Sequence, residues 1–330
     1  MNGNMTGSAI NRLVLKQIRG VALQVPPLAE QRRIADKLDK LLARIDASRE
    51  RLDQVANNAE RLCQSVLAAA RSGALSAAWR EARQDAGAWQ QTTLGEVVNV
   101  GTGSTPLLFN PSFFAPDGIA WVTRAATWLR HDQGSQSEHV TDAAVKVHRL
   151  TVYKPGTLLV AMYGKGKTIG QVVELAIDAT INQACTAIQI DESVMHRYFA
   201  KLMLQAHYFD MRDLAEGGNQ PNLNLAKVRG LELPLPPLDE QVEICRRAER
   251  HMGLAGRMDQ RFRQACAQLQ GVVGDSLAKA FCGELVPQDP TDQPAQALLD
   301  RLRASTHPVH RPPNGAAALP SEKNPPSGRF

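Results

Sequence analysis

The residues best suited to ligand chemistry form a basic stretch near the middle of the chain. Between Asp142 and Glu174 the sequence has five basic residues and no acidic one. The hydroxyls of Tyr163 and Thr168 lie on its glycine-rich part. Positive charge and hydroxyls on such a loop suit contacts with phosphates and base edges. An ordinary solvated hairpin is the alternative interpretation. The basic residues are Lys146, Arg149, Lys154, Lys165 and Lys167.

A second group of candidates consists of amides and one arginine that follow predicted strands or lie in loops. Asparagine and glutamine can hold adenine by two hydrogen bonds, and arginine can hold guanine. Amide side chains in loops also commonly bond to the local backbone, so a purely structural role is the competing interpretation. The residues are Arg124, Asn182, Gln183, Asn219 and Gln220.

Two segments imitate nucleotide-binding motifs, and their spacing excludes both. Tyr163 to Thr168 reads YGKGKT, but the first glycine of a phosphate-binding P-loop would fall at Ala161. Val97 to Ser104 reads VVNVGTGS and is followed by NPSF at 110–113, a pair of features found in adenine methyltransferases. Only 105–109 separate them, whereas one parallel crossover needs a dozen or more residues. A tight turn explains 101–106 more simply.

Composition limits the remaining possibilities. The net charge of 38 − 33 = +5 permits nucleic-acid binding without requiring it, and residues 92–224 carry 10 − 12 = −2. The five cysteines form no C-x-x-C pair, which argues for a reducing compartment and against a zinc site. No catalytic triad, carboxylate pair or metal-ligand cluster can be argued. With no apolar run long enough to span a membrane and no signal-peptide pattern, we expect a cytoplasmic protein.

The elements that must position these residues are organised around an internal repeat. Residues 19–34 read RGVALQVPPLAEQRRI and residues 229–244 read RGLELPLPPLDEQVEI, a shift of 210 positions with nine of sixteen pairs identical. The prolines favour an extended form, and the acidic residues behind them favour the start of a helix. One structural unit is therefore expected twice, with a different segment between the copies.

A long helix is predicted after each proline pair. Apolar residues recur at alternating steps of four and three from Ile34 to Ala69, which is the heptad pattern of a coiled coil. The second copy keeps the phase from Ile244 to Val272, because 210 is a whole number of heptads. Its seam is weaker, and we expect glycines to interrupt that helix. They are Gly253, Gly256, Gly271 and Gly274.

Two arrangements of the helices are possible. A heptad seam alone favours a homodimeric rod. The segment between the copies favours an intramolecular antiparallel pair, because the termini of a domain often lie close together. Within that segment, short β-rich runs bounded by glycine and proline and one helix from about 193 to 214 predict an α+β globule.

The doubled PPL-x-EQ-x-x-I followed by a long helix resembles the conserved regions of the specificity subunits of type I restriction-modification enzymes. The resemblance covers about 7–285. It implies a mixed α/β target-recognition domain flanked by two long helices that form an antiparallel coiled coil. The first of the family's two recognition domains is absent from the sequence. It further implies double-stranded DNA as ligand, and methyltransferase and restriction/translocase subunits as partners.

The predicted division of the chain follows from the repeat and the resemblance. Residues 1–14 match the end of the globule and read as the remnant of a preceding recognition domain. Further along we expect an elbow and long helix at 15–75, a linker at 76–91 and the recognition domain at 92–224. A second elbow and helix at 225–285 precede a proline-rich disordered tail at 286–330, with a short helix near 295–304.

The resemblance predicts a subunit without catalytic activity that recognises one half of a bipartite DNA target. S-adenosylmethionine, ATP and Mg²⁺ would be bound by partner subunits and not by this chain. With one recognition domain, a working form would need two copies and a palindromic target. The mixed charges on the first helix could dock a partner subunit, although a solvated face with i,i+4 pairs is the simpler interpretation. A coiled-coil scaffold that binds only protein is the alternative function, and a self-contained methyltransferase is a third.

Overall fold

The computed structural model describes residue 18 and residues 20–83, 87–123, 138–164, 167–215 and 222–305. The chain divides into two compact units. The smaller unit comprises residues 1–50 and 266–330, and the larger unit comprises residues 51–265. Residues 1–14, predicted to be the remnant of another domain, lie outside the described part of the chain.

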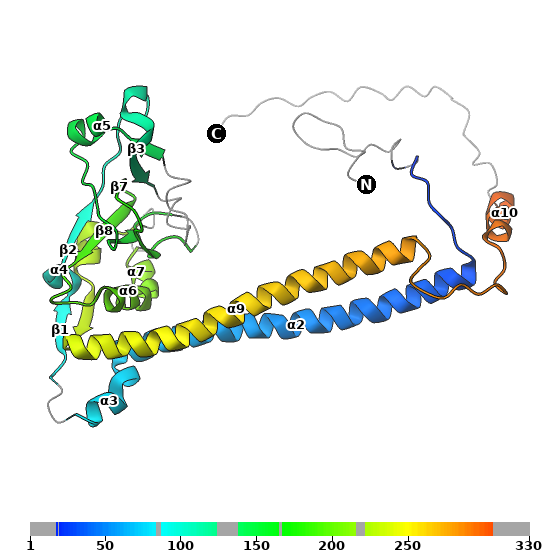
Figure 1. The fold of residues 1–330 in the computed structure, drawn as a ribbon, viewed down its shortest axis with the longest axis horizontal. Helices are drawn as coiled ribbons and strands as arrows, with labels where there is room; N and C mark the ends of the chain where they lie inside the picture. Colours follow the sequence, from blue (N-terminus) through cyan, green and yellow to red (C-terminus); the bar gives the residue numbers. More distant parts are fainter. Residues whose placement is uncertain are drawn as a thin grey trace, which may run out of the picture. The chain divides into compact units, whose positions relative to one another are not determined.

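Two long helices, α2 (Leu28–Ser72) and α9 (Leu238–Phe281), contribute to both units. In the smaller unit, the ammonium of Lys37 near the start of α2 donates to the carbonyl of Leu285 beyond the end of α9, at 2.7 Å. In the larger unit, Arg247 near the start of α9 donates to the carbonyl of Leu75 beyond the end of α2, at 2.9 Å. Within each unit the helices therefore run antiparallel, as predicted (Figure 1).

The heptad seam of α2 is buried or half-buried along its length, and Ile45, Ala59 and Val66 are its most enclosed residues. In α9 the seam shifts near its end. Val272 is 46% exposed, and the neighbouring Val273 is half-buried instead. A straight helix with 3.6 residues per turn drifts against a strict 3.5-residue repeat, which explains a shift by one position.

The expected interruption of the second helix by glycines was wrong. Helix α9 is continuous through Gly253, Gly256, Gly271 and Gly274. The last three have no other atom within 4 Å of an added Cβ, so they occupy open surface positions. A glycine in an exposed helix interior costs about 1 kcal/mol relative to alanine. Packing along 44 residues outweighs that cost.

The larger unit contains three small sheets, which confirms the α+β class. An antiparallel sheet has the order β2-β8-β5-β6, a mixed sheet has the order β4-β3-β7 with β3 and β7 parallel, and β1 pairs with β9. The strands are β1 (Gln90–Thr93), β2 (Val98–Thr102), β3 (Phe114–Val122), β4 (Glu138–Val140), β5 (Leu158–Ala161), β6 (Val172–Glu174), β7 (Ala179–Ile181), β8 (Cys185–Ile190) and β9 (Glu232–Leu235).

Short helices surround these sheets and connect them to the long pair. They are η2 (Ala74–Ser76), α3 (Ala77–Glu81), α4 (Leu94–Val97), η3 (Pro111–Phe113), α5 (Asp142–Val147), α6 (Arg197–Ala206), α7 (Tyr208–Ala215) and α8 (Leu225–Arg229). One further short helix, α10 (Ala295–Ser305), belongs to the smaller unit. The single helix expected over 193–214 is divided at buried His207, whose ring binds Asp210 at 2.8 Å. None of the described helices has the length and apolarity needed to cross a membrane.

Strand β5 is the centre of the core because both of its faces are covered. Leu158 and Val160 pack in one apolar cluster with Phe199 of α6. Leu159 points to the opposite face and packs in a second cluster with β7 and β8. This alternation is the expected consequence of strand geometry. Sequence periodicity located β2, β3, β5, β6 and β8 approximately, but it missed β1, β4, β7 and β9.

The two proline elbows close in the same way. We call residues 20–31 the first elbow and residues 230–241 the second elbow. The Gln31 amide donates to the carbonyl of Pro26, and the Gln241 amide donates to the carbonyl of Pro236, both at 2.8 Å. The repeated EQ dipeptide therefore ties the extended segment to the first turn of the helix in both copies.

The segment 76–91, predicted only as a linker, holds helix α3 and binds the second elbow. The carboxylate of Glu240, fully buried, accepts from Ser76 Oγ at 2.6 Å, from Trp89 Nε1 at 2.9 Å and from the guanidinium of Arg80. Arg80 also donates to the carbonyl of Gly73 at 2.8 Å. These contacts were not predicted from the sequence, because the partners of Glu240 are about 150 residues away along the chain.

The start of the predicted disordered tail is also partly ordered. Arg33 of α2 pairs with Asp292 at 2.6 Å, and helix α10 lies where a short helix was expected. Proline content alone therefore did not decide the structure of 286–305, since an ion pair holds Asp292 to α2. Residues 306–330 lie outside the described part of the chain.

Candidate nucleic-acid interface

Backbone hydrogen bonds bring several predicted loops to one end of the sheets. The amide of Ser104 donates to Ile181 at 3.1 Å, and the amide of Asn182 donates to Val122 at 3.1 Å. Met162 joins two more segments: its amide donates to Ala184 at 2.9 Å, and its carbonyl accepts from Leu223 at 3.0 Å. We call residues 103–107, 122–123, 162–164, 167–168, 182–184 and 222–223 the loop cluster.

The strand directions explain why these loops meet. Strands β3 and β7 are parallel, and both terminate at this end of the sheets. Strand β8 begins there and pairs antiparallel with β2 and β5, which both end there. Five strands thus begin or end at the same end of the sheets. This is the kind of rigid scaffold on which loops carry binding residues.

The hairpin between β5 and β6 carries the glycine-rich part of the basic stretch. Tyr163 and Lys167 have exposed side chains, and Thr168 is buried. An added Cβ at Gly164 would lie 2.5 Å from the Thr168 Cβ, so the close approach of these two residues requires glycine. Lys167 is therefore presented to solvent next to the close approach of Gly164 and Thr168.

Helix α7 supports this turn from one side. The Tyr208 hydroxyl donates to the carbonyl of Lys167 at 2.9 Å, and Arg212 donates to the same hydroxyl at 2.9 Å. The Arg212 guanidinium lies 5.5 Å from the centre of the Tyr208 ring. Sequence reasoning missed Arg212, although its spacing of four residues from Tyr208 on a helix was a usable signal. The turn therefore has a second positive charge nearby.

The amides of 182–183 are engaged within the fold. Asn182 Oδ1 accepts from the amide of Ala184 at 3.0 Å. This is a bond to the local backbone, as the structural interpretation of these amides predicts. Gln183 Oε1 accepts from the hydroxyl of Thr105, which connects the 101–106 turn to the start of β8. These contacts hold the loop cluster in shape, whatever else the two amides bind.

Three predicted basic residues lie away from the hairpin turn. Lys154 pairs with Asp178 at 2.6 Å and precedes β5, at the opposite end of that strand from the turn. Lys146 and Arg149 are exposed, in α5 and in the turn after it. Arg149 has φ 50°, a conformation uncommon outside glycine. The basic stretch is thus divided between different parts of the larger unit.

Four predicted site residues lie outside the described part of the chain, namely Arg124, Lys165, Asn219 and Gln220. Thr123 belongs to the loop cluster and directly precedes Arg124. Leu223 belongs to it through its bond to Met162. The described residues that flank these masked segments in sequence, Thr123, Gly164 and Asn222, all belong to the loop cluster.

The motifs that imitate nucleotide chemistry have local explanations here. Asn110 of NPSF accepts from the amide of Ser112 at 3.1 Å and caps the short helix η3. An added Cβ at Gly103 would lie 1.8 Å from the carbonyl oxygen of Ile181, so this glycine is needed for the close approach of two backbones. Among the described residues, no group of three or more His, Cys, Asp or Glu could hold a metal ion.

Comparison with known proteins now adds to this geometry. A model of the type I restriction modification DNA specificity domain matches residues 1–57 and 87–253, which is more than half of the chain. The chain belongs to this family. The match includes both elbows and all of 92–224, the predicted recognition domain.

Two curated members of this specificity-domain family are similar over most of the chain. The StySPI specificity subunit of Salmonella potsdam is 27% identical over 90% of this chain and 66% of its own length. The EcoBI specificity subunit of Escherichia coli is 26% identical over 92% of this chain and 68% of its own length. The chain therefore spans about two thirds of the length of these relatives.

Solved structures show the same fold. One is a chain from work on complex assembly and conformational transition of the type I R-M system, with a TM-score of 0.63, 20% identity and coverage of 84% of this chain and 66% of that one. Another is the HsdS subunit from Thermoanaerobacter tengcongensis, with a TM-score of 0.50, 19% identity and coverage of 86% and 67%. The architecture predicted from the repeat is thus that of known specificity subunits.

Proposed function

We propose that this chain recognises one half of a bipartite DNA target as a non-catalytic specificity subunit of a type I restriction-modification complex. Family membership supports DNA recognition as its general role. The observation that carries the finer proposal is the loop cluster, where the exposed Lys167 lies on a turn held by Tyr208 and Arg212. Positive groups on a fixed backbone can bind phosphates and orient neighbouring side chains toward base edges.

Salt-dependent DNA binding tests the proposed interface. Binding of the purified chain to duplex DNA containing its target should weaken steeply as salt rises, since phosphate contacts release counterions. Changing Lys167 to Ala should weaken binding and lower the slope of log affinity against log salt by about one. Lys165→Ala is expected to act in the same direction.

Lys154→Ala is the matched control, because Lys154 is in the same basic stretch but pairs with Asp178 at the other end of β5. It should leave both affinity and salt slope nearly unchanged. Equal effects of Lys154→Ala and Lys167→Ala would remove the hairpin turn from the interface. Absence of any salt-sensitive DNA binding would favour the alternative of a scaffold that binds only protein.

The long helices are proposed to dock methyltransferase subunits, through which a restriction/translocase subunit joins. Two of the charged residues on α2 have contacts within the chain, because Arg33 pairs with Asp292 and Lys37 bonds to Leu285. Lys40 and Arg44 are exposed and remain candidates for a docking face. Changing both to Glu should reduce co-purification with the methyltransferase subunit, whereas unchanged co-purification would place the dock elsewhere.

The cofactors of the complex are assigned to the partners in this proposal. S-adenosylmethionine would bind the methyltransferase subunits, and ATP with Mg²⁺ would bind the translocating subunit. Calorimetric titration of the purified chain with S-adenosylmethionine should therefore show no binding. Saturable binding would instead support a self-contained methyltransferase.

In this proposal the segment between the two elbows reads one half of the target. Two copies of the chain would give a palindromic motif with a fixed gap. Sequencing of methylated adenines in cells that contain this chain and its methyltransferase subunit measures that symmetry. A non-palindromic motif would exclude the two-copy arrangement, without bearing on DNA recognition by the loop cluster.

A further inference from the structure

The second elbow binds the recognition domain through an extended segment and a buried carboxylate. The first elbow has the same two features, but no described residues bind to them in the same way. In the second elbow, strand β9 pairs with β1, and Leu233 is 2% exposed. At the equivalent position in the first elbow, Leu23 is 65% exposed. No described strand pairs with residues 22–25, the counterpart of β9. The first elbow thus presents an extended segment with an exposed apolar side chain.

The same contrast applies to the buried carboxylates of the two copies. Glu240 has Ser76, Arg80 and Trp89 as donors. Its counterpart Glu30 is only 4% exposed, and its Oε1 has no hydrogen-bond partner among the described residues. A buried carboxylate oxygen without a donor is costly. The missing donors are explained by the sequence, because the positions equivalent to Ser76, Arg80 and Trp89 are Val286, Pro290 and Leu299.

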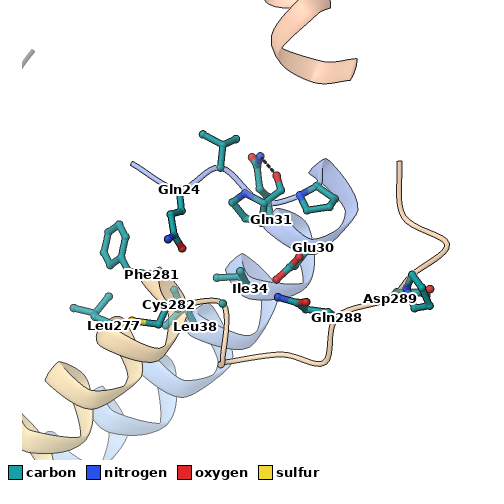
Figure 2. Close-up of a pocket in the computed structure, with 16 residues that line it drawn as sticks. Gln24, Glu30, Gln31, Ile34, Leu38, Leu277, Phe281, Cys282, Gln288 and Asp289 are labelled. Atoms are coloured by element: carbon teal, nitrogen blue, oxygen red, sulfur yellow. Dashed lines mark hydrogen bonds between the residues drawn. The ribbon is translucent and has the colours of Figure 1, made fainter. Parts of the chain in front are cut away.

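Glu30 lines a pocket of about 730 Å³ that lies wholly within the smaller unit. Figure 2 shows Gln24 and Phe281 on one side of it and Glu30 with Gln288 on the other. Its apolar lining includes Ile34, Leu38 and Leu277. Gly283 lines the pocket just beyond the end of α9 with φ 74°, as Gly73 lies just beyond the end of α2 with φ 77°. The left-handed glycine against which Arg80 and Trp89 lie in the larger unit therefore has a counterpart here.

We propose that the first elbow binds a segment of another polypeptide that carries an arginine and an indole followed by an extended strand. The arginine would pair with Glu30 as Arg80 pairs with Glu240, and the strand would pair with residues 22–25 as β1 pairs with β9. Such strand addition takes its affinity from main-chain bonds and its specificity from side-chain pockets. A partner of this kind is favoured over a second copy, because each copy has one segment 76–93 and already holds it on its own second elbow.

The probe is a fluorescein-labelled peptide with the sequence of residues 76–93, which contains every donor named above and strand β1. Its fluorescence anisotropy is measured with the full chain and without DNA, so the outcome does not depend on the proposed function. We expect saturable binding that is at least about tenfold weaker for Glu30→Gln, because a charge-assisted hydrogen bond is lost. A peptide with Arg80→Gln should be weakened to a similar degree.

Two further variants keep the test specific. Leu23→Asp changes an exposed side chain, so it should weaken peptide binding without affecting folding. Glu50→Gln is the matched control, since it makes the same substitution on the exposed face of α2, and it should bind like the unchanged chain. Equal binding by the Glu30→Gln and Glu50→Gln variants would overturn the proposal, as would an absence of saturable binding by the full chain.

Two other occupants give distinguishable results. If the peptide binds only to a chain shortened to end at Ser305, the chain's own C-terminal segment is the occupant. If the full chain sediments as a dimer that Glu30→Gln dissociates, a second copy is the occupant. Either result would overturn the assignment of the site to a different polypeptide.

Discussion

The repeat supplies a matched pair of buried carboxylates: Glu240 accepts from three side chains, whereas Oε1 of Glu30 has no donor among the described residues. Changing Arg80 to Met removes the cation that faces Glu240 and keeps much of the apolar stem. Removing one partner of a buried ion pair costs about 3–5 kcal/mol, because an uncompensated charge remains. The side chain of Arg80 is 30% exposed, and Glu240 keeps its bonds from Ser76 and Trp89. We therefore expect the larger unit to lose about 2–3 kcal/mol of unfolding free energy.

Urea unfolding followed by tryptophan fluorescence measures this loss, because all four tryptophans lie between residues 51 and 265. Combining Arg80→Met with Glu240→Gln should cost less than the sum of the single changes, by at least about 1 kcal/mol, since the amide needs no counter-charge. Glu30→Gln should be neutral or slightly stabilising by circular dichroism, because a neutral amide is less costly to bury than an unpaired carboxylate.

The reasoning would be refuted by additive effects in the larger unit, which would mean that Arg80 and Glu240 do not interact energetically. It would also be refuted by a loss of about 2 kcal/mol for Glu30→Gln. That loss would show that Glu30 already has a strong partner within the chain. The two carboxylates differ in surroundings but not in type, so each serves as the control for the other.

Two other predictions concern glycines and pH. Changing Gly256, Gly271 or Gly274 to Ala should raise thermal stability by about 0.5–1 kcal/mol each, since these are exposed helix positions with open space around them. Gly103→Ala should destabilise the larger unit by about 2 kcal/mol or more, because the new methyl would overlap the carbonyl oxygen of Ile181; equal effects at all four positions would contradict this. Hydrogen bonds from Arg246 and then Arg247 lower the pKa of Glu243 from 4.5 to about 2, so Glu243 contributes stability above pH 4.5 that is lost as the pH falls toward 2. The difference in urea midpoint between the unchanged chain and Glu243→Gln should be constant above pH 5.5 or so and disappear near pH 2, and a difference that grows in acid would be inconsistent with this sign.

The large-scale architecture followed from the sequence because repeated patterns carry it. A period of 3.5 residues over 40 or so positions fixes a helix and its apolar face regardless of what lies elsewhere. The proline pairs and the EQ dipeptides mark where each helix begins, and the structure places both starts there, at Leu28 and Leu238. The exception is informative: the glycines of α9 lower local helix propensity, yet seam packing along the whole helix outweighs them.

The short strands of the larger unit were harder to predict, because their order depends on partners far away in sequence. Strand β1 reads QQTT, with no apolar alternation, and it is a strand because β9 pairs with it across 140 or so residues. Strand β7 has three residues and pairs with β3 in parallel, a pairing that sequence periodicity does not reveal. Propensity alone could not select either one.

For the candidate site, the sequence identified the hairpin turn with Lys167 and the loops around it as the chemically distinctive positions. It also determined the doubled elbows and the coiled coil, because periodicity and repetition are visible in the sequence without knowledge of the fold. Only the tertiary structure decided which basic residues meet. Lys154 is set at the far end of β5, and Arg212 is brought to the turn by α7. It also decided that Glu240 is paired while Glu30 Oε1 has no partner among the described residues, because burial and hydrogen-bond partnership depend on what the fold places opposite each residue.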